Sequence, residues 1–86
     1  MEKELYDKLI SSIPEKFKND IIHELEFNHS NIGGITLDHF IISCKSVLDN
    51  KKLYLRKVIH NLTKESIDDR MKDIKELEDY IEEIAQ

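Results

Sequence analysis

Residues 64–84 of the chain read KESIDDRMKDIKELEDYIEEI, and this stretch decides the fold. Its apolar side chains recur at steps of three, four and seven residues, which is the spacing of one face of an α-helix. Thr63, directly before it, is of a residue type that caps helix N-termini through its hydroxyl oxygen. We therefore predict a long charged helix with a narrow apolar seam, which is also a candidate dimer interface. The members of the seam are Ile67, Ile74, Leu77, Ile81 and Ile84.

The same stretch carries the net charge of the whole chain. Residues 64–86 hold nine acidic and four basic side chains, whereas residues 1–63 hold nine of each. The formal net charge of −5 and the isoelectric point near 5.3 therefore originate in the C-terminal helix. An acidic surface of this kind steers basic macromolecules toward it. We predict a partner-binding acidic face made of Asp69, Asp73, Glu76, Asp79 and Glu83.

The rest of the chain also predicts helices. Helical apolar stripes occupy residues 2–11, about 13–27 and 37–48, and the chain has only two Gly and one Pro to interrupt them. Gly33 and Gly34 mark a loop over residues 28–34. Thr36 is a credible N-cap for the third helix, with Asp38 in the first turn, where the helix dipole favours an anion.

The sequence after Leu48 leaves two arrangements open. Asp49 and Asn50 suit a helix end followed by a new cap, and we expect the break there. The seven-residue spacing from Leu48 to Leu55 fits one continuous helix over residues 37–62 almost as well. In either case we predict an all-α protein: one domain over residues 1–86, folded as a compact bundle of four to five helices, with the acidic C-terminal helix the longest.

The composition limits the cellular setting. An apolar content of 40% and a charged content of 36% are typical of a globular domain with a charged shell. Cys44 has no second cysteine with which to form an internal disulfide, so a reducing compartment is expected and we predict a cytoplasmic protein. Because no apolar run approaches the ~18–20 residues of a membrane span, we predict no membrane partner.

Residue spacing gives no indication of metal binding or catalysis. The histidines and Cys44 do not fall at zinc-ligand spacings, and Cys44 lies on an apolar stripe, which predicts a buried structural thiol. His23 and His29 are expected to be solvated. The serines lack a nucleophile motif, and carboxylates on a helix surface stay ionised in water. We therefore predict no metal, no cofactor and no catalytic residue, and a protein that is not an enzyme.

A basic segment precedes the acidic helix. Residues 45–57 carry a net charge of +4 with Tyr54 in their middle. These cations could contact phosphates while Tyr54 stacks on a base. The alternative, which we favour, is that the segment packs near the acidic helix and the two neutralise each other, since an acidic protein repels a polyanion. The bases of this candidate patch are Lys45, Lys51, Lys52, Arg56 and Lys57.

Arg70 interrupts the apolar seam, and its environment should differ between a seam that is a dimer interface and a seam that is an intramolecular core. If the seam is a dimer interface, Arg70 should meet a carboxylate across it, because a buried arginine must be paired. If the seam is an intramolecular core, Arg70 should extend to the rim and reach water. We expect the second arrangement.

The leading functional hypothesis is a small acidic non-enzymatic binding protein that blocks or neutralises a basic protein partner. Inhibitors, immunity proteins and phage or bacterial anti-defence proteins share this physical type, by analogy. The alternative is a homodimeric helical regulator or assembly subunit. It would use the C-terminal seam, with nucleic acid contacted through residues 45–57.

Overall fold

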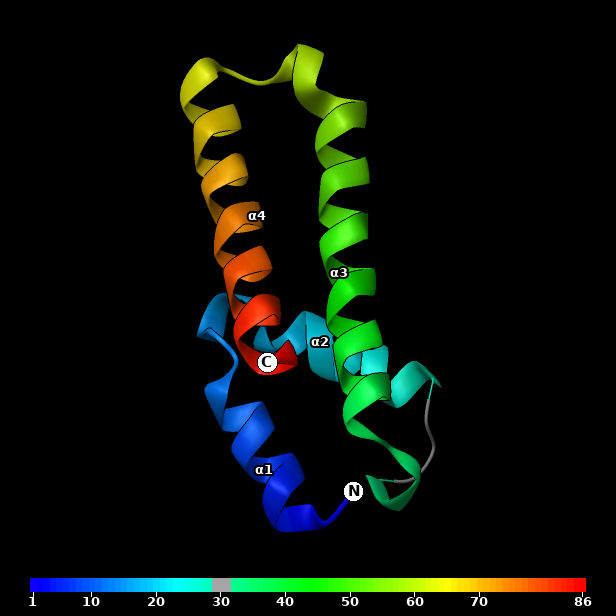
Figure 1. Cartoon of the computed structure of the whole chain (residues 1–86). Helices are drawn as coiled ribbons and strands as arrows, with labels where there is room; N and C mark the ends of the chain where they lie inside the picture. Colours follow the sequence, from blue (N-terminus) through cyan, green and yellow to red (C-terminus); the bar gives the residue numbers. More distant parts are fainter. Residues whose placement is uncertain (29–31) are drawn as a thin grey trace. The chain divides into compact units, whose positions relative to one another are not determined.

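The computed structural model describes residues 1–28 and 32–86 of the chain. Within these residues it contains α-helices and 3₁₀ turns and no strand, which confirms the all-α prediction (Figure 1). The elements are α1 (Lys3–Ser12), α2 (Glu15–Asn28), η1 (Ile32–Gly34), α3 (Leu37–Val58), η2 (Ile59–Asn61) and α4 (Lys64–Ala85). The expected loop over residues 28–34 lies partly outside the described residues, and its last three residues form η1.

The predicted break at Asp49–Asn50 is wrong. α3 runs without interruption through both residues, which are exposed, and ends only at Val58 before the single turn of η2. Asp and Asn cost only a few tenths of a kcal/mol each in a helix interior. Leu48 and Leu55, seven residues apart, are both buried and hold the helix on one face across the weak point. The described residues therefore form four α-helices rather than five.

α4 begins where the sequence predicts. The Thr63 hydroxyl accepts a hydrogen bond of 3.2 Å from the Ser66 amide, which confirms the predicted cap. The expectation that the C-terminal helix is the longest is wrong, because α3 and α4 each contain 22 residues. The chain divides into two compact units, Met1–Val47 and Leu48–Gln86, with the boundary inside α3. The compact bundle and the single domain stay predictions.

The first unit has a well-filled apolar core. Phe17, Ile21 and Leu25 occupy one face of α2 at steps of four, as a helix surface requires, and all three are buried. The Glu24 carboxylate connects α2 to α3: it accepts hydrogen bonds from the Ser46 hydroxyl at 2.9 Å and from the Asn28 side-chain amide at 3.2 Å. Further buried apolar side chains of this unit are Ile13, Ile35, Phe40, Cys44 and Val47.

The start of α3 carries a reciprocal cap. The Thr36 hydroxyl accepts from the His39 amide at 3.1 Å, and the Thr36 amide donates to His39 Nδ1 at 3.3 Å. His39 thus takes the place that Glu or Gln holds in the usual capping box. Thr36 is confirmed as the N-cap residue, with Asp38 in the first turn of the helix.

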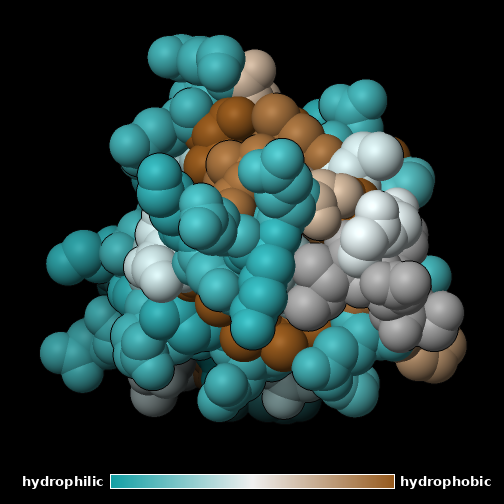
Figure 2. Space-filling view, turned by 90° about the horizontal axis from the view of Figure 1, so that it is seen from below, coloured by the Kyte–Doolittle hydropathy of each residue, from teal (hydrophilic) through white to brown (hydrophobic). Residues whose placement is uncertain are grey.

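α1 is covered less completely than α2. None of its side chains is fully buried. Tyr6 is half-buried, and burial raises the pKa of its hydroxyl group; the nearby carboxylates of Glu26 and Asp7 raise this pKa further. On the face seen in Figure 2, apolar residues reach the surface among hydrophilic ones.

In the second unit, the second half of α3 and α4 lie side by side, antiparallel, and are joined through η2 (Figure 1). We call this arrangement the hairpin. An ion pair and a cation–π contact bridge it: Lys52 Nζ lies 3.1 Å from Glu78 Oε1, and the Arg70 guanidinium carbon lies 5.4 Å from the centre of the Tyr54 ring. The buried residues of this unit are Leu48, Leu55, Leu77, Tyr80 and Ile81.

Candidate interaction surfaces

The five carboxylates of the predicted acidic face share one side of α4. They follow one another at steps of four, three, three and four residues, so at 3.6 residues per turn they span about a third of the helix circumference. Asp73 is half-buried and the other four are exposed: Asp69, Glu76, Asp79 and Glu83. Four of the five carboxylates therefore meet solvent, although Tyr80, which lies within the same arc of the helix, is buried.

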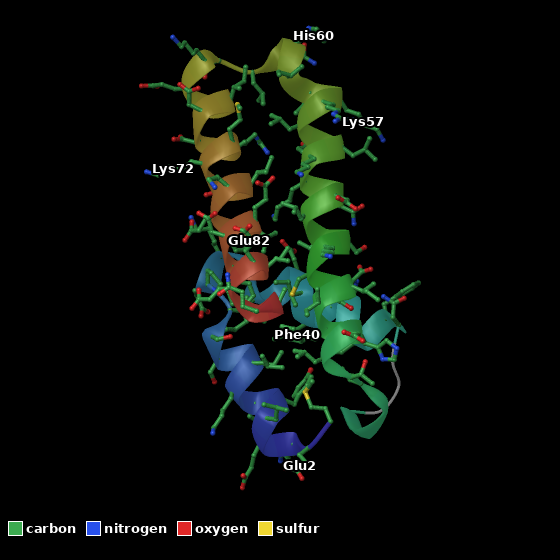
Figure 3. The ribbon with its side chains drawn as sticks, in the orientation of Figure 1. Glu2, Phe40, Lys57, His60, Lys72 and Glu82 are labelled. Carbon is green, nitrogen blue, oxygen red and sulfur yellow. The ribbon has the colours of Figure 1, made fainter. Side chains whose placement is uncertain are left out.

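The acidic face is partly neutralised by lysines of the same helix. Lys75 Nζ donates to Asp79 Oδ1 at 2.9 Å, and this hydrogen bond, followed by the charge of Asp79, raises the pKa of Lys75. Lys72 extends away from the hairpin on the outer side of α4 (Figure 3). With nine acidic residues against four basic ones in residues 64–86, the helix keeps a clear negative excess.

The predicted basic patch stays a prediction. Lys45 belongs to the first unit and the other four to the second. Lys52 and Arg56 share a face of α3, four residues apart, whereas Lys57 extends outward in another direction (Figure 3). The carboxylate of Glu78 binds Lys52, so part of the basic segment does face the acidic helix, as the favoured alternative expects.

The apolar seam is covered unevenly. Leu77 and Ile81 are buried, whereas Ile67, Ile74 and Ile84 are half-buried. The first two are thus already used within the chain. What the seam leaves for another molecule lies toward its start, at Ile67 and Ile74.

Arg70 lies at the rim of the seam. It is exposed, and its guanidinium stacks over the Tyr54 ring of the neighbouring helix. This is the geometry expected of an arginine beside an intramolecular core, where the stem covers apolar surface and the charge stays wet. Its position among the bases did not predict this contact of Tyr54, whose side chain is 54% exposed.

Cys44 is a buried free thiol, as its place on the apolar stripe predicts. Among the described residues no group of three or more His, Cys, Asp or Glu side chains could hold a metal ion. His23 is exposed, as expected, and His29 lies outside the described residues. Burial raises the pKa of the Cys44 thiol from 9.0 to about 12.

This shift makes Cys44 a reporter of folding. In the native protein at pH 8 we expect negligible modification by a thiol-specific reagent, and complete modification in denaturant. Because the folded pKa exceeds the unfolded one, the contribution of the neutral thiol to stability is complete below pH 9.0 and is lost as the pH rises toward about 12. Denaturant titrations should therefore show a loss of stability in this window that Cys44→Ala reduces. Rapid native labelling at pH 8 would contradict the burial.

No protein-family model matches the chain, and no curated protein or solved structure matches it either. None of the described helices combines the length and the apolar character that crossing a membrane requires.

Proposed function

We infer that this chain is a non-enzymatic binding protein whose acidic face on α4 blocks or neutralises a basic macromolecular partner in the cytoplasm, in the manner of an inhibitor or immunity protein. The observation that carries the proposal is the gathering of five carboxylates on one side of one helix. Between Asp69 and Glu83 they extend over about 21 Å at 1.5 Å rise per residue. A strip of this length can meet several cations of one partner at once.

The acidic face contains two pairs of like charges along the helix. Asp69 and Asp73, like Asp79 and Glu83, are like charges four residues apart, and each such pair destabilises a helix by a few tenths of a kcal/mol. A basic partner would relieve this repulsion on binding. Because four of the five carboxylates are exposed, their main effect is on the rate of encounter.

The acidic face is also well placed for docking. Its residues lie on the side of α4 away from Ile67 and Ile74, as the spacing of the two sets requires. A partner that covers the carboxylates therefore leaves the packing of α3 on α4 undisturbed. Tight binding needs no rearrangement of the hairpin, which keeps the cost of association low.

The regulator hypothesis has weaker support. Its dimer seam includes Leu77 and Ile81, which are buried within the chain. Its nucleic-acid contact relies on a set of bases of which one, Lys52, already forms an ion pair with Glu78. We therefore propose no second function.

A comparative pull-down from cells of the source organism tests the proposal. The variant Asp69→Lys/Glu83→Lys reverses two exposed charges of the acidic face. The control Glu4→Lys/Glu26→Lys makes the same net change on exposed residues of the first unit. We expect a basic protein to be retained by wild type and control and lost from the acidic-face variant. Equal retention by all three proteins, or loss from the control alone, would refute the proposal.

A further inference from the structure

The hairpin is thinly packed compared with the first unit. Over residues 49–74, all of which the structure describes, Leu55 is the one buried residue, and 9% of its surface remains exposed. By contrast, Phe40 and Cys44 in the first unit are fully covered. Two helices alone leave much of each apolar stripe open, and such hairpins are commonly completed by further helices.

Three incompletely covered apolar side chains of α4 form a row on one side of the hairpin, whereas the exposed Leu53 and Tyr54 of α3 lie outside it. On α4, Ile67, Met71, Ile74 and Glu78 follow at steps of four, three and four, so they share a face. Ile67 and Ile74 are half-buried, and Met71 is 56% exposed. A long flexible thioether in this position suits an apolar contact.

A matching row lies on the neighbouring helix. Lys52 and Arg56 on α3 and Ile59 at the start of η2 follow at steps of four and three, and Ile59 is exposed. The ion pair between Lys52 and Glu78 connects this row to the row on α4. Both rows therefore lie on the same side of the hairpin, which we call the pairing face.

The charges of the pairing face are complementary to those of a second copy of the same face. A twofold axis parallel to the helices brings α3 of a second copy over α4, and the reverse contact occurs at the same time. Lys52 of each copy then faces Glu78 of the other, so the two ion pairs become a quartet of alternating charges. A twofold axis across the helices would instead set Lys52 against Lys52 and Glu78 against Glu78. The side chains of the pair are 42% and 40% exposed, so a second copy can reach them.

We propose that the pairing face binds a second copy of this chain, so that two hairpins form a four-helix interface about a twofold axis parallel to α3 and α4. Each copy contributes Ile59, Ile67, Met71 and Ile74 to the apolar centre. The interface differs from the predicted seam, since it omits Leu77, Ile81 and Ile84 and adds Ile59 and Met71. On α4 it lies opposite the acidic face, so the dimer presents that face twice.

Sedimentation velocity at micromolar concentrations tests this proposal without any partner, so its outcome is independent of the proposed function. We expect a mass of twice 10.2 kDa for wild type. Met71→Glu should raise the dimer dissociation constant at least about tenfold, the effect of ~1.4 kcal/mol. The control Ile42→Glu, in which the replaced side chain is 62% exposed on the first unit, should leave the dimer unchanged.

A charge exchange provides the second readout. Lys52→Glu turns the quartet into four carboxylates and should dissociate the dimer, whereas Lys52→Glu combined with Glu78→Lys should restore it. Circular dichroism establishes that each variant is folded. A monomeric wild type overturns the proposal. So does a dimer that resists both Met71→Glu and Lys52→Glu, one that Ile42→Glu weakens equally, or one that the charge exchange fails to restore.

Discussion

Replacing Phe17 by alanine is expected to remove most of the stability of the fold, because it removes the largest filled position on α2. Phe17 is 1% exposed, and truncating a buried phenylalanine costs about 3–5 kcal/mol in lost apolar burial and cavity formation. A domain of this size has a total stability of only about 5–15 kcal/mol, and small domains lie at the lower end. Denaturant titrations followed by circular dichroism measure the loss.

The chain offers a matched control for this change. Phe27 lies on the same helix but is 79% exposed. Phe27→Ala should change the free energy of unfolding by less than about 0.5 kcal/mol, as expected for an exposed position. Equal effects of the two substitutions would contradict the core described for the first unit.

Local signals predicted the helices best where a stripe and a cap coincided. Thr63 precedes the stripe of α4 and Thr36 precedes that of α3, and both accept the expected backbone hydrogen bond. Cys44 is buried as its stripe position predicts. At these positions the apolar periodicity and the capping residue favour the same helix start, and tertiary packing favours it as well.

The predicted helix break was wrong because the weak local preference of two polar residues is outweighed by the burial of apolar residues around them. Asp49 and Asn50 favour a helix end, but the buried pair of Leu48 and Leu55 keeps α3 continuous. The relative lengths of the two long helices depend on where each terminates. α3 ends at Val58, short of Leu62, because η2 replaces its last turn.

The sequence predicted which residues make up the acidic face, but it did not predict which side chains of α3 and α4 contact each other. Residue types located the acidic face on α4, whereas the contacts of Tyr54 with Arg70 and of Lys52 with Glu78 depend on the register between two antiparallel helices. No sequence pattern in a single chain specifies that register. Met71 is absent from the predicted seam because it does not fall on the seven-residue repeat of isoleucines. Its spacing of four from Ile67 was the signal available.

The second large effect concerns the rate of partner binding. Reversing Asp69 and Glu83 to lysine is expected to slow association with the basic partner about tenfold or more, because exposed charges act mainly on diffusional encounter. Both residues are exposed, so the helix should remain folded. Glu4→Lys/Glu26→Lys, with the same net charge, should keep a rate within about twofold of wild type, because local charge distribution as well as net charge steers the encounter.

Stopped-flow association rates for these three proteins, measured from low salt to physiological salt, test the role of the acidic face most directly. The rates of wild type and control should fall as the Debye length shortens to about 8 Å at physiological ionic strength. The acidic-face variant should start slow and respond little to salt. If all three proteins associate at the same rate at every salt concentration, the acidic face is not the binding surface and the proposed function is wrong.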